Sequence, residues 1–237
     1  RDPRVFVETN VVGTQVLLEA ARRVGVAKFV HVSTDEVYGE LELEPTTFFT
    51  EQTPVQPNSP YSASKAASDL FVQAYHQTFE LPMNIIRCSN NYGPYQYPEK
   101  LIPLTISRAL NNEKIPIYGD GQNIRDWLHV LDHCAAIDVV LHHGVNGEVY
   151  NIGGHNERTN LQVVKTILHT LGKSQQLIEF VEDRLGHDKR YAIDPTKIEQ
   201  LGWKPHFTFE SGIAQTIHWY VDNQAWLEHV HRRRIHM

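Results

Sequence analysis

The chain has 237 residues, of which 41% are hydrophobic, and a formal net charge of -6. This length allows one large domain or a domain with a smaller lobe, and no apolar run approaches the roughly 20 residues of a membrane span. The negative charge argues against non-specific nucleic-acid binding, so neither nucleic acid nor a membrane is an expected partner.

The first third of the sequence alternates helix and strand. Apolar residues recur at helical spacing over residues 5–24 before Gly25, and a short apolar run over 28–33 predicts a buried strand. The same order repeats with a helix over 61–79 and a strand over 83–88, separated from the first pair by a proline-rich loop over 41–60. This alternation predicts an α/β fold with a doubly wound parallel sheet.

Prolines break the chain into shorter elements after residue 93. We expect a helix over 99–110, and then a strand over 125–130, a helix over 132–142 and a strand over 149–152 that return to the main sheet. Asn160 and Thr208 are expected to cap two later helices, and residues 229–237 are expected to be frayed. The predicted main domain is therefore 1–93 with 120–152, and the predicted smaller mixed α/β lobe is 94–119 with 153–237.

Candidate catalytic groups follow the first predicted strand. Residues 33–36 fall at its carboxyl end, where open α/β sheets bind ligands. Tyr61 and Lys65 are one helical turn apart on one helix face. A phenol with a pKa near 10 costs roughly 4 kcal/mol to use as a base at pH 7 unless a positive charge such as Lys65 lowers that pKa. Taken alone, Tyr61 and Lys65 are better explained as a solvated surface pair. Ser33 and Thr34 change this interpretation, because a hydroxyl there can hydrogen-bond a substrate alcohol together with the phenol, which favours oxidation of an alcohol.

Asp35 and Glu36 suggest that the reaction also removes water. A charged pair after an apolar strand is equally typical of a solvated loop. However, oxidising one carbon to a ketone acidifies the neighbouring C–H, so that one carboxylate can take this proton while a protonated carboxyl group expels a hydroxyl.

The cysteines and histidines indicate no metal site. Cys88 and Cys134 lack metal-ligand spacing, and the histidines form no His-Glu-x-x-His motif. We expect both cysteines to be buried thiols, and a reducing, cytoplasmic location fits them.

Five motifs together resemble the dTDP-glucose 4,6-dehydratase family of extended short-chain dehydrogenase/reductases, over most of residues 5–222. They are STDEVYG (33–39), PYSASK (60–65), RCSNNYGPYQYPEKLIP (87–103), YGDGQNIRDWLHV (118–130) and GHDKRYAID (186–194). Related 4-epimerases carry small residues in place of Asp35 and Glu36, and related dehydratases and decarboxylases usually carry Ser in place of Asp35. Asp35 with Glu36 therefore points to the dTDP-glucose branch.

The resemblance implies an NAD-dependent lyase that converts dTDP-glucose to its 4-keto-6-deoxy form. Tyr61 would remove the proton of the sugar 4-hydroxyl, with Thr34 bonded to the same oxygen. Glu36 would take the C5 proton, and Asp35 would protonate the leaving C6 hydroxyl. Lys65, with Tyr61 and Asn91, would contact NAD in a Rossmann-like domain.

The resemblance also implies a set of residues that line the nucleotide-sugar site. They are Thr34, Asn90, Lys100, Leu101, Pro116, Tyr118, Arg125, Asn160, Arg184, His187 and Tyr191. Independently, a diphosphate bound to an acidic protein needs local guanidinium groups, for which Arg125 and Arg184 are candidates, although each could equally form a surface salt bridge. Helices 5–24 and 61–79 resemble those that pair in this family's homodimers.

The family's Gly-x-x-Gly-x-x-Gly turn and its first strands are absent from these 237 residues. A product of this length is expected neither to hold NAD tightly nor to turn over. The alternatives are therefore another nucleotide-sugar dehydratase or decarboxylase, or an inactive truncated binding module.

Overall fold

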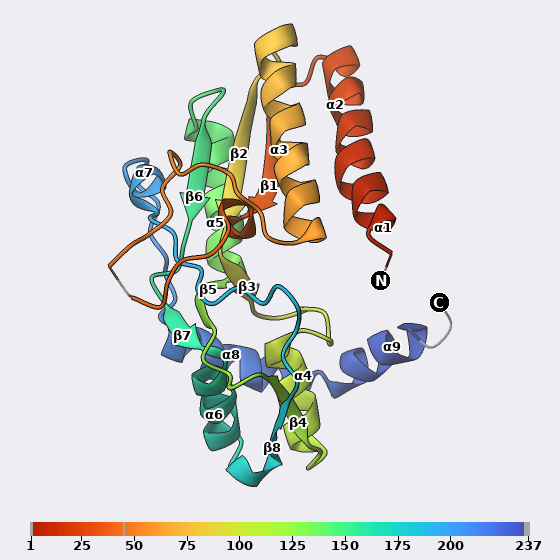
Figure 1. Ribbon diagram of the computed structural model, residues 1–237, viewed down its shortest axis with the longest axis vertical. Coiled ribbons are helices and arrows are strands. Elements are labelled where there is room, and N and C mark those ends of the chain that lie inside the picture. The colour runs from red at the N-terminus through yellow and green to blue at the C-terminus, as the bar shows by residue number, and fades with distance from the viewer. Residues whose placement is uncertain (1, 45, 235–237) are drawn as a thin grey trace.

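The computed structural model describes residues 2–44 and 46–234, which form the elements labelled in Figure 1. The first half contains α1 (Arg4–Phe6), η1 (Val7–Val12), α2 (Gly13–Val24), β1 (Phe29–Thr34), η2 (Asp35–Tyr38), α3 (Pro60–Phe79), β2 (Met83–Cys88), β3 (Asn90–Tyr92), α4 (Leu101–Leu110) and β4 (Ile115–Tyr118). The second half contains β5 (Ile124–His129), α5 (Val130–His143), β6 (Val149–Ile152), β7 (Glu157–Thr159), α6 (Asn160–Thr170), η3 (Gln175–Leu177), β8 (Ile178–Val181), α7 (Thr196–Glu199), α8 (Phe209–Asp222) and α9 (Gln224–Arg234).

The main sheet has the strand order β1-β2-β6, and all its strands are parallel, as the helix–strand alternation predicted. Its register places Thr34 opposite Cys88, and Cys88 opposite Ile152, so the three carboxyl ends lie level at one edge. Ile85 and Ile86 are consecutive strand residues and therefore face opposite sides of the sheet. Ile85 packs with residues of α2 and α3 and Ile86 with residues of α5, so helices cover both faces.

The helical segment before β1 follows the prediction for residues 5–24, although its turns over Val7–Val12 are π-helical. It ends at Gly25, whose φ of 69° is a left-handed conformation that glycine adopts without steric cost. α2 packs on α3, and α3 contacts both β1 and β2. Among the described residues, no helix combines the length and hydropathy that crossing a membrane requires.

β5 does not join the main sheet, which corrects the prediction for residues 125–130. It pairs in parallel with β3 and antiparallel with β7, while β6 occupies the edge of the main sheet beside β2. β3 begins two residues after β2 ends, so the chain leaves the main sheet there and offers a new edge to β5. The strand predicted over 149–152 does return to the main sheet as β6.

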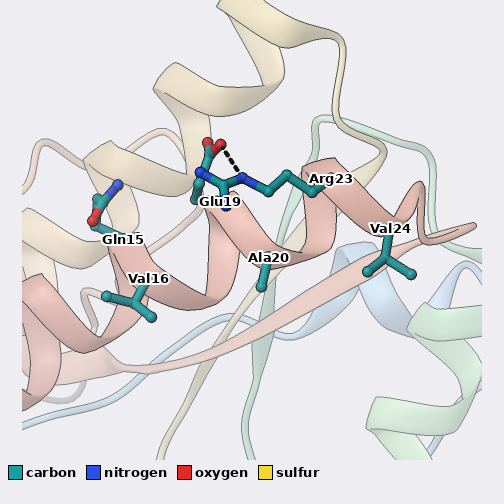
Figure 2. A pocket seen from close by; sticks show the side chains of 6 residues that line it. All are labelled: Gln15, Val16, Glu19, Ala20, Arg23 and Val24. Carbon is teal, nitrogen blue, oxygen red and sulfur yellow. Dashed lines mark hydrogen bonds and ion pairs between the residues drawn. The ribbon is translucent and has the colours of Figure 1, made fainter.

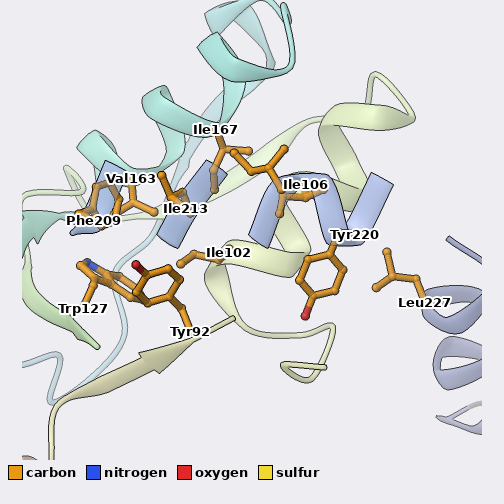
Figure 3. Close-up of a cluster of buried hydrophobic side chains, with 11 residues drawn as sticks. Tyr92, Ile102, Ile106, Trp127, Val163, Ile167, Phe209, Ile213, Tyr220 and Leu227 are labelled. Carbon is orange, nitrogen blue, oxygen red and sulfur yellow. The ribbon is translucent and has the colours of Figure 1, made fainter. Parts of the chain in front are cut away.

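A second core lies in the lower part of the view in Figure 1, where α4, α6 and α8 gather around β4 and β8. Figure 3 shows its buried side chains, among them Ile106 of α4, Ile167 of α6 and Ile213 of α8. Thr208 caps α8 as predicted, but Thr159, not Asn160, caps α6: its hydroxyl accepts from Gln162 N in a capping box.

Two further expectations are corrected. Residues 224–234 form helix α9, so the tail expected to be frayed is helical to Arg234, and residues 235–237 lie outside the described part. Cys134 is exposed on α5, which corrects the expectation of a buried thiol, whereas Cys88 is half-buried. Ala136 and Val140 of α5 pack against the sheet, whereas residue 134 faces solvent. The spacing of apolar residues alone did not predict this orientation.

Candidate active site

Thr34, Asp35 and Glu36 lie where β1 turns into η2. The Thr34 hydroxyl caps this turn by accepting a hydrogen bond from Glu36 N over 3.3 Å. Gly39 closes the turn with a φ of 94°, and a Cβ at this position would lie 2.6 Å from Gln56 O. The two carboxyl groups are therefore held at the carboxyl edge of the sheet by a capped turn that requires glycine at its end.

Asp35 is buried in a way that favours its neutral form. It is 2% exposed, and its Oδ2 atom has no hydrogen-bond partner in the described chain. Burial raises the pKa of Asp35 well above its usual range, and the nearby carboxyl groups of Glu36 and Asp126 act in the same direction. These surroundings favour the protonated form of Asp35, which is able to donate its proton.

Glu36 lies in a different environment. Burial raises the pKa of Glu36 too, but the Arg125 guanidinium opposes this change and favours the carboxylate. Arg125 opposes the rise at both carboxyl groups, but the pKa of Asp35 is raised further than that of Glu36, and such a difference suits separate acid and base roles.

Tyr61 and Lys65 are presented by the first turns of α3. Ser59 and Ser62 form a capping box, and Pro60 occupies the first helical position, so the helix start is firmly defined. The Lys65 ammonium donates to Val32 O of β1 over 2.7 Å, which ties the helix to the edge of the sheet. The Tyr61 side chain thus projects from a fixed helix start beside the end of β1.

The lowering of the tyrosine pKa that the sequence suggested is not seen. Burial, followed by the charges of Glu36, Cys88 and Asp35, raises the pKa of Tyr61 to about 12. Burial also lowers the pKa of Lys65, while Asp69 one turn further along α3 raises it. The phenol is nevertheless 36% exposed and forms no hydrogen bond within the described residues, so it is free to bond a ligand.

Asn90 and Asn91 begin β3 at the same edge of the sheet. Asn91 Nδ2 donates to Ser89 O over 3.0 Å, and its second hydrogen faces the sulfur of Cys88 at 3.5 Å. Its Oδ1 is 2.9 Å from His133 Nδ1, which must be the donor because an amide oxygen only accepts. Burial lowers the pKa of His133 to about 4, so His133 orients Asn91 as a neutral ring.

A second group of predicted residues gathers around Arg125 and Tyr118. The Arg125 guanidinium lies 4.4 Å from the centre of the Tyr191 ring, and that of Arg184 lies 5.2 Å from the Tyr118 ring. His187 packs edge-on against Tyr118 at 6.5 Å between ring centres. Arg125 connects this group electrostatically to Asp35 and Glu36.

The remaining predicted residues lie around this second group in different ways. Lys100 directly precedes α4 and is close enough to lower the pKa of Glu36. Leu101 packs against two buried apolar clusters, one that contains Ile106 and one that contains Ile117. Pro116 lies in β4 opposite Glu179. Asn160 N donates to Asn123 O over 3.1 Å. Asn123 in turn donates from its side chain to Asp188 O, close in sequence to His187.

Sequence reasoning missed two residues near the first group of predicted residues, which consists of residues 34–36 with Tyr61, Lys65 and Asn91. Cys88 lies opposite Thr34 in the sheet and interacts electrostatically with Asp35, Tyr61 and Lys65; its place at the end of a predicted strand was the available signal. His133 had no comparable signal, because a histidine in a helical pattern is more simply a surface or core residue. Only the tertiary contact with Asn91 distinguishes it.

A surface hollow on α2 contains none of the predicted site residues. Figure 2 shows its lining, which comes from one helix: Gln15, Val16, Glu19, Ala20, Arg23 and Val24. Glu19 accepts from Arg23 over 2.9 Å across this surface. This hollow is therefore separate from the sheet edge, where the predicted catalytic residues lie.

Comparison with known proteins agrees with this geometry. A family model described as GDP-mannose 4,6 dehydratase matches residues 1–216. The dTDP-glucose 4,6-dehydratase of Xanthomonas campestris pv. campestris (strain ATCC 33913) is 54% identical over 247 residues, which cover 96% of this chain and 70% of that protein. The chain belongs to the dTDP-glucose 4,6-dehydratase family.

Solved dTDP-glucose 4,6-dehydratases have the same fold. The enzyme of Streptomyces venezuelae, with NAD and TYD bound, superposes with a TM-score of 0.94 at 50% identity and covers 97% of this chain and 70% of its own. The enzyme of Bacillus anthracis str. Ames, in complex with NAD, gives a TM-score of 0.90 at 55% identity over 94% of this chain and 71% of its own. The Rossmann-like α/β fold expected from the motifs is therefore confirmed.

Proposed function

We propose that this chain carries the chemistry of a dTDP-glucose 4,6-dehydratase, an NAD-dependent lyase that forms dTDP-4-keto-6-deoxyglucose. The observation that carries this function is the pair Asp35 and Glu36 at the end of β1, beside Tyr61. Burial raises the pKa of Asp35 well above its usual range and raises that of Glu36 less, while Arg125 opposes the rise at both carboxyl groups. An acid and a base placed beside a phenol suit an oxidation that is followed by loss of water.

NAD is the cofactor, and the residues present fit it. Lys65 has three ammonium hydrogens, of which one is used on Val32 O, so two remain for ribose hydroxyls. The Tyr61 hydroxyl has no partner within the described chain, and Asn91 can exchange its weak sulfur contact for a cofactor atom. We assign Tyr61, Lys65 and Asn91 to the cofactor, which accepts the hydride during oxidation at C4 and returns it to C6.

The protein groups handle three protons. Tyr61 takes the proton of the sugar 4-hydroxyl, while Thr34 hydrogen-bonds the same oxygen. Because burial raises the pKa of Tyr61 to about 12, this role requires that the pKa fall when ligands bind, as it would beside the positive charge of a bound nicotinamide. Glu36 then removes the C5 proton, which the new 4-keto group has acidified, and it can give this proton back to C5 when C6 receives hydride. Asp35 gives its proton to the C6 hydroxyl, which leaves as water. Support for this division comes from the raised pKa of Asp35, because burial that favours the protonated form suits the acid role.

We assign the nucleotide-sugar ligand to the group around Arg125 and Tyr118. Arg125 and Arg184 are suited to the diphosphate, because a guanidinium makes paired hydrogen bonds to phosphate. Tyr118 is 46% exposed and offers a ring face for a base. The other assigned residues are Thr34, Asn90, Lys100, Leu101, Pro116, Asn160, His187 and Tyr191.

We further propose that residues 1–93 and 120–152 form the NAD-binding part, and that 94–119 and 153–237 form the nucleotide-sugar lobe. Within the second set, Ile198 and Trp203 pack against the main-sheet cluster and so connect the two parts. A homodimer through α2 and α3 is supported by exposed apolar side chains, including Leu17 and Phe71. The free thiols of Cys88 and Cys134 suit a cytoplasmic location.

The function is tested by incubating the natural polypeptide that contains this chain with dTDP-glucose and NAD, and by identifying the product by NMR. The expected product is a 4-keto-6-deoxy sugar, with no net NADH formed. UDP-glucose and GDP-mannose serve as matched substrates that should react more slowly. A 4-epimer, a decarboxylated sugar or an unchanged substrate would contradict the proposal.

A further inference from the structure

A hydrogen bond of Asp188 links the segment that carries Arg184 and His187 to Asn58, just before the start of α3. Asn58 Nδ2 donates to Asp188 Oδ1 over 2.8 Å, and the Tyr191 hydroxyl donates to Asp188 Oδ2. Asp188 is 7% exposed, so these side chains take the place of water around its carboxylate. A buried carboxylate with one partner on each oxygen is a strong local constraint.

Asn58 lies at a firmly held point of the chain. It directly precedes Ser59, the N-cap of α3, and is three residues before Tyr61. The other segment passes close by, because a Cβ at Gly186 would be 3.8 Å from Asn58 O. The Asn58 side chain therefore bridges from the catalytic helix to residues 183–188.

The chain after Asp188 is held by separate contacts. Lys189 N donates to Glu40 Oε2 over 3.0 Å, and Leu41 N donates to Arg190 O over 3.0 Å. These contacts fix residues 189–190 along the loop that follows η2. The hydrogen bond from Asn58 instead restrains the chain just after Arg184 and His187.

We propose that Asn58 is a positioning residue for nucleotide binding. By holding Asp188, it keeps His187 and Arg184 against Tyr118 and so sets the affinity for the nucleoside diphosphate part of the substrate. Asn58 would act through Asp188 and not by contact with the substrate. The inference rests on the proposed function, because it concerns the same nucleotide-sugar site.

The test measures binding of dTDP by calorimetry in the natural polypeptide, with Asn58→Ala compared with wild type. Loss of a hydrogen bond to a charged group predicts that Kd rises about tenfold. KM for dTDP-glucose should rise by the same factor, while kcat at saturation stays within about twofold, since Tyr61 and the two carboxyl groups are untouched. Asn58→Asp should weaken binding further, because it places a second carboxylate against Asp188.

Glu42→Gln is the matched control. It removes the exposed ion pair with Lys189, 3.3 Å long, one residue from Asp188, and should leave Kd unchanged. Asn58→Ser keeps a shorter donor and should give a smaller loss than Asn58→Ala. Thermal unfolding of each variant identifies any that does not fold, and the milder Asn58→Ser then provides the comparison.

Two failures are distinguishable. A wild-type protein that binds no dTDP refutes the proposed function and this inference with it. Equal Kd values for wild type and Asn58→Ala refute the inference alone, since Asn58 would then have no effect on nucleotide binding. A fall in kcat with unchanged Kd also refutes it alone, since Asn58 would then affect α3 and its catalytic residues.

Discussion

Arg87 Nε donates to Asp69 Oδ2 over 2.9 Å, one helical turn beyond Lys65 on α3. Asp69 and Arg87 are 1% and 3% exposed, and the Arg87 guanidinium also lies 4.8 Å from the centre of the Tyr38 ring. The pair ties α3, which carries Tyr61 and Lys65, to β2. Because Asp69 also raises the pKa of Lys65, it helps to keep that ammonium charged.

Breaking this pair should destabilise the fold. Arg87→Met leaves Asp69 buried without its partner, and such a loss lowers the free energy of unfolding by about 3–5 kcal/mol. Urea denaturation measures the change. Asp69→Asn combined with Arg87→Met should recover part of it, and Glu19→Gln in the exposed pairs on α2 is the control, with little effect expected. Unchanged stability in Arg87→Met would show that the pair is not a structural tie.

Glu36→Gln should separate oxidation from elimination. The amide cannot take the C5 proton, but Tyr61 still accepts the proton of the 4-hydroxyl. On mixing the NAD-loaded natural polypeptide with dTDP-glucose, reduced nicotinamide should accumulate, and its absorbance reports this directly. Asp35→Asn, which retains Glu36, is the comparison: it should slow loss of the hydroxyl while C5 still exchanges with deuterium. Dehydration at the wild-type rate in Glu36→Gln would exclude Glu36 as the base.

Asp35 should make stability depend on pH. Its pKa in the folded state is well above the usual range of an aspartate, so folding favours the protonated form. Its stabilising contribution is complete below the unfolded pKa and is lost as pH rises through the folded pKa. In urea unfolding, wild type should therefore lose stability relative to Asp35→Asn as pH rises above the unfolded pKa of about 3.9. Parallel stability curves for the two proteins would contradict a buried, protonated Asp35.

Tyr61→Phe should remove the base for the first step. Loss of a general base reduces the rate by about 10²–10⁴-fold. Single-turnover formation of reduced nicotinamide, measured in the Glu36→Gln background, isolates this step. The Kd for dTDP should not change, because Tyr61 lies in the first group of site residues and not beside Tyr118. A variant that oxidises the sugar at the original rate would assign the base role elsewhere.

Local patterns predicted much of the fold and the first half of the site. The spacing of apolar residues over 5–24 and 61–79 determined two helices, and the run over 28–33 determined the strand that carries Asp35 and Glu36. Thr208 was predictable as a cap because capping depends on residues within one turn. Thr159 was missed in favour of its neighbour Asn160, since both are residue types that cap helices.

The sequence by itself determined which elements form and which reactive groups end β1 and begin α3, because hydrophobic periodicity and capping act over a few residues. Only the tertiary structure decided that β5 leaves the main sheet, that Cys134 faces solvent, and that the pKa of Tyr61 is raised. It also decided the contact between Asn58 and Asp188, which are 130 residues apart. Burial, strand edges and long-range hydrogen bonds depend on which segments pack together, and no local pattern encodes them.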